Sequence, residues 1–439
     1  MSRPTRTPTA SRRRPDAAGI EAKARPGLAP RQVYAVAGCY FVASFAALGL
    51  PPYLTEILPE LGDGAARWAG LLYVVPTVFG AIGAPLWGRL ADRFGRKRLL
   101  LRAQLGLAGA FLLAGWADSL PTFTVALVIQ GVLGGTFAAS NGYLGAALEG
   151  RALSRALTLM QGSARAALVF APIVVGSLTP WLSPHRQYAV LAVLPLAAAG
   201  LLAALPDSPR TRATGPSQTT ADTEDAADGA VPGDGTAPDE PSGRTPAASL
   251  RALYALQFTF VFSTVISFPY LISLIQERIP GTGPMVSGVL FALPHMCYLV
   301  AAIPVHNLFH RRPRLGISLG FGCIALGLAG HGTAHSLAAF VVVRLVLGAG
   351  LTLGLVCMSV LAAECAKGRA PGGLFGSIEF FSKAGAVAAG LAAAAGNDWF
   401  GPAAPLLTGT AIALATVVAT TVPGLLPRLS RTLRTRRSP

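Results

Sequence analysis

Long apolar segments alternate with short polar ones along most of the chain. Most of these segments are close to the ~20 apolar residues that a helix needs to cross the hydrocarbon core of a bilayer. The pattern therefore predicts an all-α integral membrane protein with twelve transmembrane helices. We place them near residues 33–55, 68–90, 98–117, 121–146, 156–180, 187–205, 251–275, 284–308, 315–332, 337–360, 372–396 and 403–425.

Three polar regions lie outside these segments and define the domain organisation. Residues 1–31 are rich in Arg, Pro and Ala, residues 206–248 are rich in Pro, Gly, Thr and acids, and residues 427–439 are basic. Such compositions cannot bury an apolar core. We expect a disordered N-terminus, a flexible linker and a basic tail around two six-helix bundles, 32–205 and 249–426.

Composition supports the membrane class and narrows the function. Only 13% of the 439 residues are charged, against about 25% in an average soluble domain. The formal net charge of +16 does not indicate a nucleic-acid partner, because the basic residues cluster at the ends of apolar segments. Five cysteines lie in or beside these segments without metal-ligand spacing, so we expect neither a metal site nor a cofactor.

The basic residues also predict the orientation in the membrane. They concentrate in alternate loops, at 88–98, 151–155, 311–314 and 367–369, and in both terminal segments. Cytoplasmic loops carry the excess of Lys and Arg. Both termini and the central linker are therefore expected in the cytoplasm, with the protein in the cell (inner) membrane.

An internal repeat divides the chain into two halves. Shifting the sequence by 218 residues places Pro51 on Pro269, Gly70 on Gly288 and Pro76 on Pro294 without a gap. Loop arginines coincide as well, with Arg93 falling on Arg311. A constant offset over so many landmarks predicts two parallel six-helix repeats, related by an axis along the membrane normal.

The segment between the second and third apolar segments carries the most informative motif. Glycines at both ends permit a tight turn, and its basic residues and one acid, Asp92, must lie in water. The motif comprises Gly88, Leu90, Asp92, Arg93, Gly95, Arg96 and Lys97. In this position it resembles the signature of the major facilitator superfamily, which implies the twelve-helix transporter fold and a gating role for these residues. An ordinary basic turn would not require these glycines and this acid.

Charges at membrane depth are functional candidates, because burying them is costly. The repeat places Gln161 on Glu379 and Arg165 on Lys383. Each pair is spaced i, i+4 and so shares one helix face. We expect a central cavity lined by the fifth and eleventh helices, with these residues on the substrate and proton pathway. The alternatives are a structural Glu379–Lys383 ion pair, and a counterion or carbonyl partner for Arg165 elsewhere.

Other polar residues are candidates for the same pathway. Arg344 opens an Arg-x-x-x-Gly pattern in the tenth helix, whereas the superfamily carries this pattern in the fourth helix. His295 is either a hydrogen-bonded core residue or a proton carrier. Asn141 lies in the fourth helix, which lines the cavity in this superfamily, with Tyr143 and Gln130 as weaker candidates there.

A last motif concerns the direction of transport. Pro172 and Gly176 resemble the end of the superfamily's antiporter motif, with two of its glycines missing.

These features predict a secondary active transporter, not an enzyme, that works by alternating access as a monomer. A net positive cavity favours an anionic or carboxylate-bearing solute, and the antiporter-like motif favours proton-coupled efflux. The chain loosely resembles bacterial siderophore exporters. A multidrug exporter, an uptake symporter and a non-transporting receptor or scaffold remain alternatives.

Overall fold

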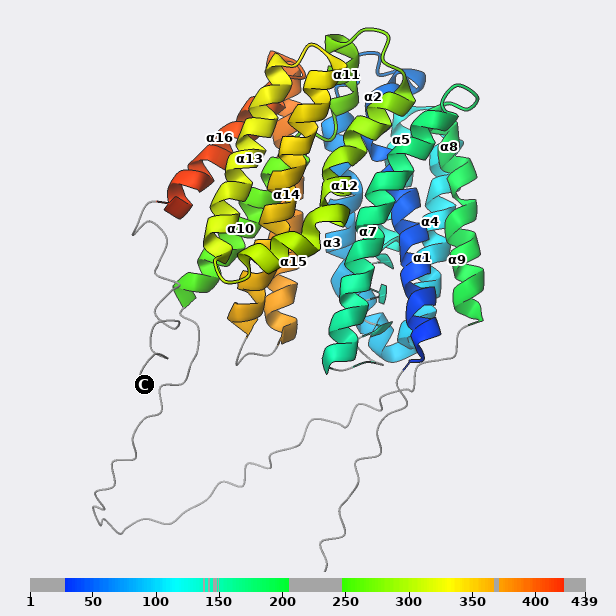
Figure 1. The fold of residues 1–439 in the computed structure, drawn as a ribbon. Helices are drawn as coiled ribbons and strands as arrows, with labels where there is room; N and C mark the ends of the chain where they lie inside the picture. Colours follow the sequence, from blue (N-terminus) through cyan, green and yellow to red (C-terminus); the bar gives the residue numbers. More distant parts are fainter. Residues whose placement is uncertain are drawn as a thin grey trace, which may run out of the picture.

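A computed structural model describes residues 28–136, 139–140, 143–144, 148, 150–204, 247–366 and 371–421. Within these residues all regular secondary structure is helical, arranged as one bundle (Figure 1). The expected disordered N-terminus up to residue 27, nearly all of the linker and the basic tail lie outside the described residues. α1 begins at Pro30 and α10 at Ala247, so the helices extend slightly into the predicted N-terminal segment and linker.

The first half of the chain supplies six spans. They comprise α1 (Pro30–Gly49), the 3₁₀ turn η1 (Pro51–Tyr53), α2 (Leu54–Ile57), the 3₁₀ turn η2 (Leu58–Leu61), α3 (Ala69–Phe94), α4 (Arg96–Gly115), α5 (Leu120–Leu133), α7 (Gly150–Leu178), α8 (Pro184–Leu191) and α9 (Val193–Ala203). Prolines at or near the first position start several of these helices, because the missing N–H is not needed there.

The second half repeats this order. It comprises α10 (Ala247–Val265), α11 (Leu271–Arg278), α12 (Pro284–Phe309), α13 (Pro313–Thr333), α14 (Leu337–Ala366), α15 (Pro371–Phe400) and α16 (Ala404–Thr421). Adding 218 to the bounds of α4 gives 314–333, which is nearly the range of α13. The helices thus follow the offset found in the sequence.

The number of spans agrees with the hydrophobic pattern. Among the described residues, nine helical segments are long and apolar enough to cross a bilayer. Three shorter apolar helices, Ala69–Gly83, Leu120–Leu133 and Leu250–Val265, occupy the remaining positions. Together they confirm the predicted all-α architecture of twelve spans in two six-helix halves.

Several predicted spans are interrupted rather than continuous. The fourth was expected to run from 121 to 146, but α5 ends at Leu133, because Gly134 leaves helical geometry and Gly135 has a φ of +78°. The first span breaks at Pro51 and the seventh near Pro269. A proline lacks the N–H that would continue the helix, and a glycine tolerates a positive φ.

The two halves pack closely at one end of the bundle, which we call the distal end. It carries α2, α11 and the first turns of α3 and α12, at the top of Figure 1. A Cβ on Gly70 would lie 2.8 Å from the Gly390 carbonyl oxygen, so only glycine permits this contact between α3 and α15. Gly176 likewise meets Pro284, between α7 and α12. The opposite, proximal end holds the start of α1 and the turn between α3 and α4.

Candidate functional site

The 88–97 motif lies at the proximal end, where α3 ends and α4 begins. Gly95 separates the two helices with a φ of +95°, a conformation that favours glycine. Lys97 Nζ donates to the Ala203 carbonyl oxygen at 3.1 Å, which ties the turn to the end of α9. The Arg93 guanidinium lies 5.5 Å from the Phe94 ring. The side chains of Asp92 and Arg96 lie outside the described part of the structure.

Glu379 and Lys383 face one another on α15. Lys383 Nζ lies 3.6 Å from Glu379 Oε1, and the two side chains are 38% and 44% exposed, respectively. Both side chains of the pair are therefore only partly buried. Gln161, which the repeat relates to Glu379, is exposed on α7.

Arg165 reaches from α7 towards the second half of the chain. Its guanidinium carbon lies 5.6 Å from the centre of the Tyr298 ring on α12. A cation over an aromatic face is attracted by the ring quadrupole. The side chain is half-buried, so this contact joins the two halves at mid-depth.

Arg344 is fully buried between α14 and α12. Its Nε donates to the Leu290 carbonyl oxygen and its Nη2 to that of Phe291, both at 2.8 Å. His295, on the next turn of α12, is 1% exposed and lies 6.0 Å from the rings of Phe268 and Phe291. Neither of its ring nitrogens has a hydrogen-bond partner among the described residues. Both residues lie in the helix packing rather than on an open face.

The antiporter-like motif lies on α7 where the halves meet. Pro172 falls inside this helix, and its carbonyl oxygen accepts a hydrogen bond from Tyr53 at 2.6 Å. Gly176 lies one turn further towards the distal end, against Pro284.

The candidates in the fourth span are only partly described. Asn141 is not among the described residues. Tyr143 is buried and Gln130 is 9% exposed.

A cavity of about 550 Å³ lies among α1, α3, α4 and α5, bounded by α15 and by Phe291. Its lining is largely apolar and includes the aromatic side chains of Tyr73, Trp87 and Phe268. Among the residues singled out from the sequence, Lys383 and Gln130 line it. Arg102 is a second basic residue in this wall.

Arg102 holds the broken end of α5 in place. Its guanidinium stacks 3.4 Å from the Trp87 ring, and its Nη2 donates to the Gly134 carbonyl oxygen at 3.1 Å. Trp87 Nε1 donates to the neighbouring Val132 carbonyl oxygen at 2.7 Å. The interruption of the helix frees these carbonyl oxygens, so the two side chains satisfy them beside the cavity.

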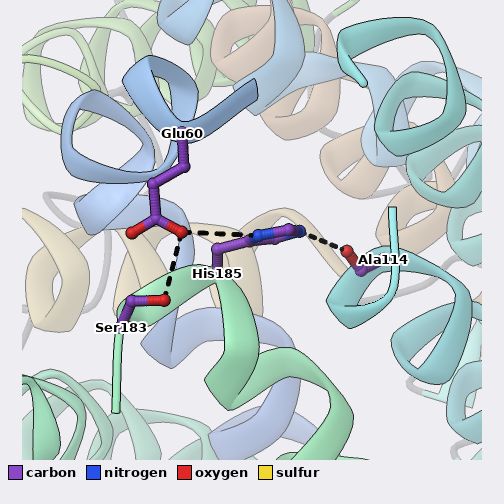
Figure 2. Close-up of polar contacts among 4 residues, drawn as sticks. All are labelled: Glu60, Ala114, Ser183 and His185. Carbon is purple, nitrogen blue, oxygen red and sulfur yellow. Dashed lines mark hydrogen bonds and ion pairs between the residues drawn. The ribbon is translucent and has the colours of Figure 1, made fainter. Parts of the chain in front are cut away.

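A polar cluster secures the distal end of the first half (Figure 2). Glu60 Oε2 accepts a hydrogen bond from Ser183 at 3.1 Å and lies 3.5 Å from His185 Nδ1. The other ring nitrogen of His185 contacts the Ala114 carbonyl oxygen at 2.9 Å. The His185 ring thereby links the Ala114 carbonyl oxygen to the Glu60 carboxylate. The cluster fixes the η1–α2–η2 segment to α8 and α4.

A comparison with protein families identifies the fold. The sequence model of the Major Facilitator Superfamily matches residues 36–330, more than half of the chain. The chain belongs to the major facilitator superfamily. Members of this superfamily are membrane transporters, not enzymes, as the motif at 88–97 predicts.

Curated relatives of this transporter are multidrug resistance proteins. It is 36% identical over 145 residues to multidrug resistance protein MdtG of Enterobacter lignolyticus, a match that covers 32% of this chain and 34% of the relative. MdtG of Salmonella arizonae is 38% identical over 107 residues, 24% of this chain and 26% of the relative. The chain thus spans about a third or less of the curated relatives it matches.

Solved structures share the fold of this transporter over nearly its whole length. A D-xylose–proton symporter has a TM-score of 0.67 at 15% identity, covering 91% of this chain and 98% of that one. The POT family transporter PepTSo has the same TM-score at 14% identity, with coverages of 90% and 97%. At these identities the likeness concerns the fold alone.

Several residues of this transporter's interior were not predicted from the sequence. Arg102 was not singled out from the sequence, although it lies within α4 and lines the cavity. The Gly134–Gly135 pair, which ends α5, is the signal that could have pointed to it. Glu60 and His185 gave no signal, because they are far apart in the chain and meet only in the folded protein.

Proposed function

We propose that this transporter exports a small molecule with an apolar body and a carboxylate or other anionic group, by proton-coupled transport. The observation that carries the proposal is Lys383, a cation exposed at the wall of a largely apolar cavity. An apolar molecule gains free energy by filling such a wall, and a fixed cation favours an anionic group on it.

The apolar lining refines the substrate class expected from the sequence. Aromatic side chains such as Tyr73, Phe268 and Phe291 favour a substantial hydrophobic surface on the ligand. A siderophore with an apolar portion fits this wall better than a small hydrophilic citrate derivative. None of the residues lining the cavity in the described structure is acidic.

Coupling is assigned to the Glu379–Lys383 pair. When Glu379 is ionised it competes with an anionic substrate for Lys383, 3.6 Å away. When Glu379 takes up a proton, Lys383 is released for the substrate. Proton binding and substrate binding therefore favour each other at this pair. The antiporter-like motif around Pro172 and the MdtG relatives support the export direction.

The orientation follows from the basic loops. With the 88–97 turn in the cytoplasm, the proximal end faces the cytoplasm and the distal end faces outwards. The contacts between the halves at the distal end then correspond to a state closed to the outside. Both termini and the linker lie on the cytoplasmic side, and the protein acts as a monomer in the cell membrane.

A matched ligand pair tests the substrate class. Binding of 1-naphthylacetate and of 1-naphthylethylamine to the purified protein is measured by equilibrium dialysis. The acid should bind more tightly than the amine. Lys383→Gln should weaken binding of the acid roughly tenfold, as expected for a lost hydrogen bond to a charged group. Binding of the amine should be unchanged. Arg251→Gln, on the exposed surface of α10, is the control.

The second candidate function is multidrug efflux. The MdtG relatives favour it, together with the apolar wall, which suits many hydrophobic molecules. If the protein binds the amine more tightly than the acid, and Lys383→Gln has no effect, the proposal of an anionic substrate is wrong and multidrug efflux takes its place.

A further inference from the structure

The distal contact between the halves centres on the hydroxyl of Tyr270. This residue lies between α10 and α11 in the second half. Its hydroxyl donates to the Arg67 carbonyl oxygen at 3.1 Å and accepts from the Gly70 backbone N–H at 3.1 Å. Both partners belong to the first half. A phenol has one donor and acceptor lone pairs, and Tyr270 uses both functions across the interface.

Tyr270 thereby caps a helix of the opposite half. Gly70 lies in the first turn of α3, where backbone N–H groups have no acceptor within the helix. The Gly70 N–H is buried against α15, since a Cβ at this position would meet Gly390 and Ala394. Separation of the halves therefore removes the hydrogen-bond acceptor of the Gly70 N–H, which is buried when the halves are in contact.

Tyr53 makes a corresponding contact from the first half. Its hydroxyl lies 2.6 Å from the Pro172 carbonyl oxygen in its own half and 3.1 Å from that of Pro284 in the other. A Cβ on Gly288 would lie 2.6 Å from this hydroxyl. The 218-residue offset relates Gly70 to Gly288 and places Tyr270 at the position next to Tyr53.

A third polar contact crosses the halves nearby. Gln276 Nε2 on α11 donates to Glu56 Oε1 on α2 at 2.8 Å. The segment that carries Tyr53 and Glu56 is fixed to its own half through Glu60, Ser183 and His185 (Figure 2). Movement of that half therefore moves both side chains as one unit.

We propose that the hydroxyls of Tyr270 and Tyr53, which lie at adjacent positions of the two repeats, stabilise the distally closed arrangement of the halves, and that Tyr270 contributes more. The Tyr270 hydroxyl loses both partners when the halves separate, because both lie across the interface. The Tyr53 hydroxyl keeps its shorter hydrogen bond to Pro172, so it loses less. The proposal rests on the transport function proposed above, and its test needs no substrate.

The test measures the distance between spin labels at the distal end of the full-length protein in lipid nanodiscs. Asp118→Cys and Ala338→Cys place labels on exposed positions of opposite halves. Cys297→Ala and Cys323→Ala remove the thiols that are not buried. Tyr270→Phe should raise the ratio of the long to the short distance by roughly threefold to tenfold, the scale expected for lost neutral hydrogen bonds.

Further variants test whether Tyr270 contributes more than Tyr53. Tyr53→Phe should shift the same ratio less than Tyr270→Phe does. Tyr254→Phe is the control, because its ring stacks 5.0 Å from Phe381 within one half, and it should leave the ratio unchanged. Gly288→Ala, which places a methyl group against the Tyr53 hydroxyl, should also favour the long distance. The proposal is overturned if Tyr270→Phe gives the unaltered distribution, or if Tyr254→Phe shifts it equally.

Discussion

Arg344 donates from Nε to the carbonyl oxygen of Leu290, four residues before Pro294. In a regular helix this oxygen would accept from the backbone N–H of residue 294, which proline lacks. The guanidinium on α14 therefore replaces a hydrogen bond that α12 cannot make. Arg344 was a pathway candidate in the sequence, and its observed contacts give it a structural role as well.

This relationship predicts a dependence between the two residues. Arg344→Met should lower the free energy of unfolding by about 2–4 kcal/mol, because two hydrogen bonds from a charged donor are lost. Pro294→Ala restores an N–H for the Leu290 oxygen. In the Pro294→Ala protein, Arg344→Met should therefore lower the free energy of unfolding by at least about 1 kcal/mol less than it does in the unaltered protein. The free energy of unfolding is measured in mixed micelles for the unaltered protein, the two single variants and the double variant. Additive effects would contradict this account.

The acid beside Lys383 predicts a change in pH dependence. Glu379→Gln removes the titrating group and leaves an amide of the same shape 3.6 Å from the ammonium. Binding of 1-naphthylacetate should then become independent of pH across the range where a carboxyl group titrates, and tighter at neutral pH. Accumulation driven by a pH gradient in proteoliposomes should be lost. Glu364→Gln on α14 is a matched control. Unchanged gradient-driven transport would exclude Glu379 from coupling.

The parts of the fold that depend on local pattern were predictable from the sequence. A run of apolar residues predicts a span wherever it lies, and the constant offset gave the correspondence of α4 with α13. The i, i+4 spacing likewise predicted that Glu379 and Lys383 would lie on one face of α15. These inferences need no knowledge of which helices touch.

The contacts between distant segments were not predictable in this way. The partners of Arg344 are backbone carbonyl oxygens of α12, and backbone atoms carry no sequence signal. Tyr53 and Tyr270 look like ordinary aromatic residues at span ends. The Tyr270 hydroxyl acquires its partners, and the Tyr53 hydroxyl its contact with Pro284, only when the halves pack. The end of α5 at Gly134 depended on two glycines within an otherwise continuous apolar run.

The polar cluster of Figure 2 predicts a local loss of stability. His185→Phe keeps the ring contact with Phe123, 6.0 Å away, but removes the hydrogen bond to Ala114 and the 3.5 Å polar contact with Glu60. We expect a loss of about 1–2 kcal/mol, on the scale of one neutral and one partly exposed charged contact. Hydrogen exchange should rise in residues 51–61 before it rises in the cores of α4 and α5. Uniform acceleration would point to a global effect.

The orientation predicts where the central linker lies. Ser217→Cys is expected on the cytoplasmic side, because the basic loops place both ends of the linker there. A membrane-impermeant maleimide added to intact cells should leave it unlabelled and should label it after permeabilisation. Asp118→Cys, exposed at the distal end, is the control and should react in intact cells. Labelling of Ser217→Cys from outside would reverse the assigned orientation.

The motif between α3 and α4 predicts a shift opposite to that of Tyr270. In the superfamily this motif is thought to hold the cytoplasmic side shut when the outer side is open, with its acid as the anchoring charge. Asp92→Asn should therefore favour the distally closed state and lower the ratio of long to short distances between labels at residues 118 and 338. Membrane expression should stay near normal.

Combining the two changes provides the decisive comparison. Tyr270→Phe weakens the closed distal end and Asp92→Asn weakens the closed proximal end, so the double variant should return towards the original distance ratio. The two sites lie at opposite ends of the bundle, and effects of distant sites on one equilibrium add as free energies. Asp92→Asn should slow transport, and Tyr270→Phe should partly restore it. A double variant that stays at the Tyr270→Phe ratio would show that Asp92 takes no part in this equilibrium.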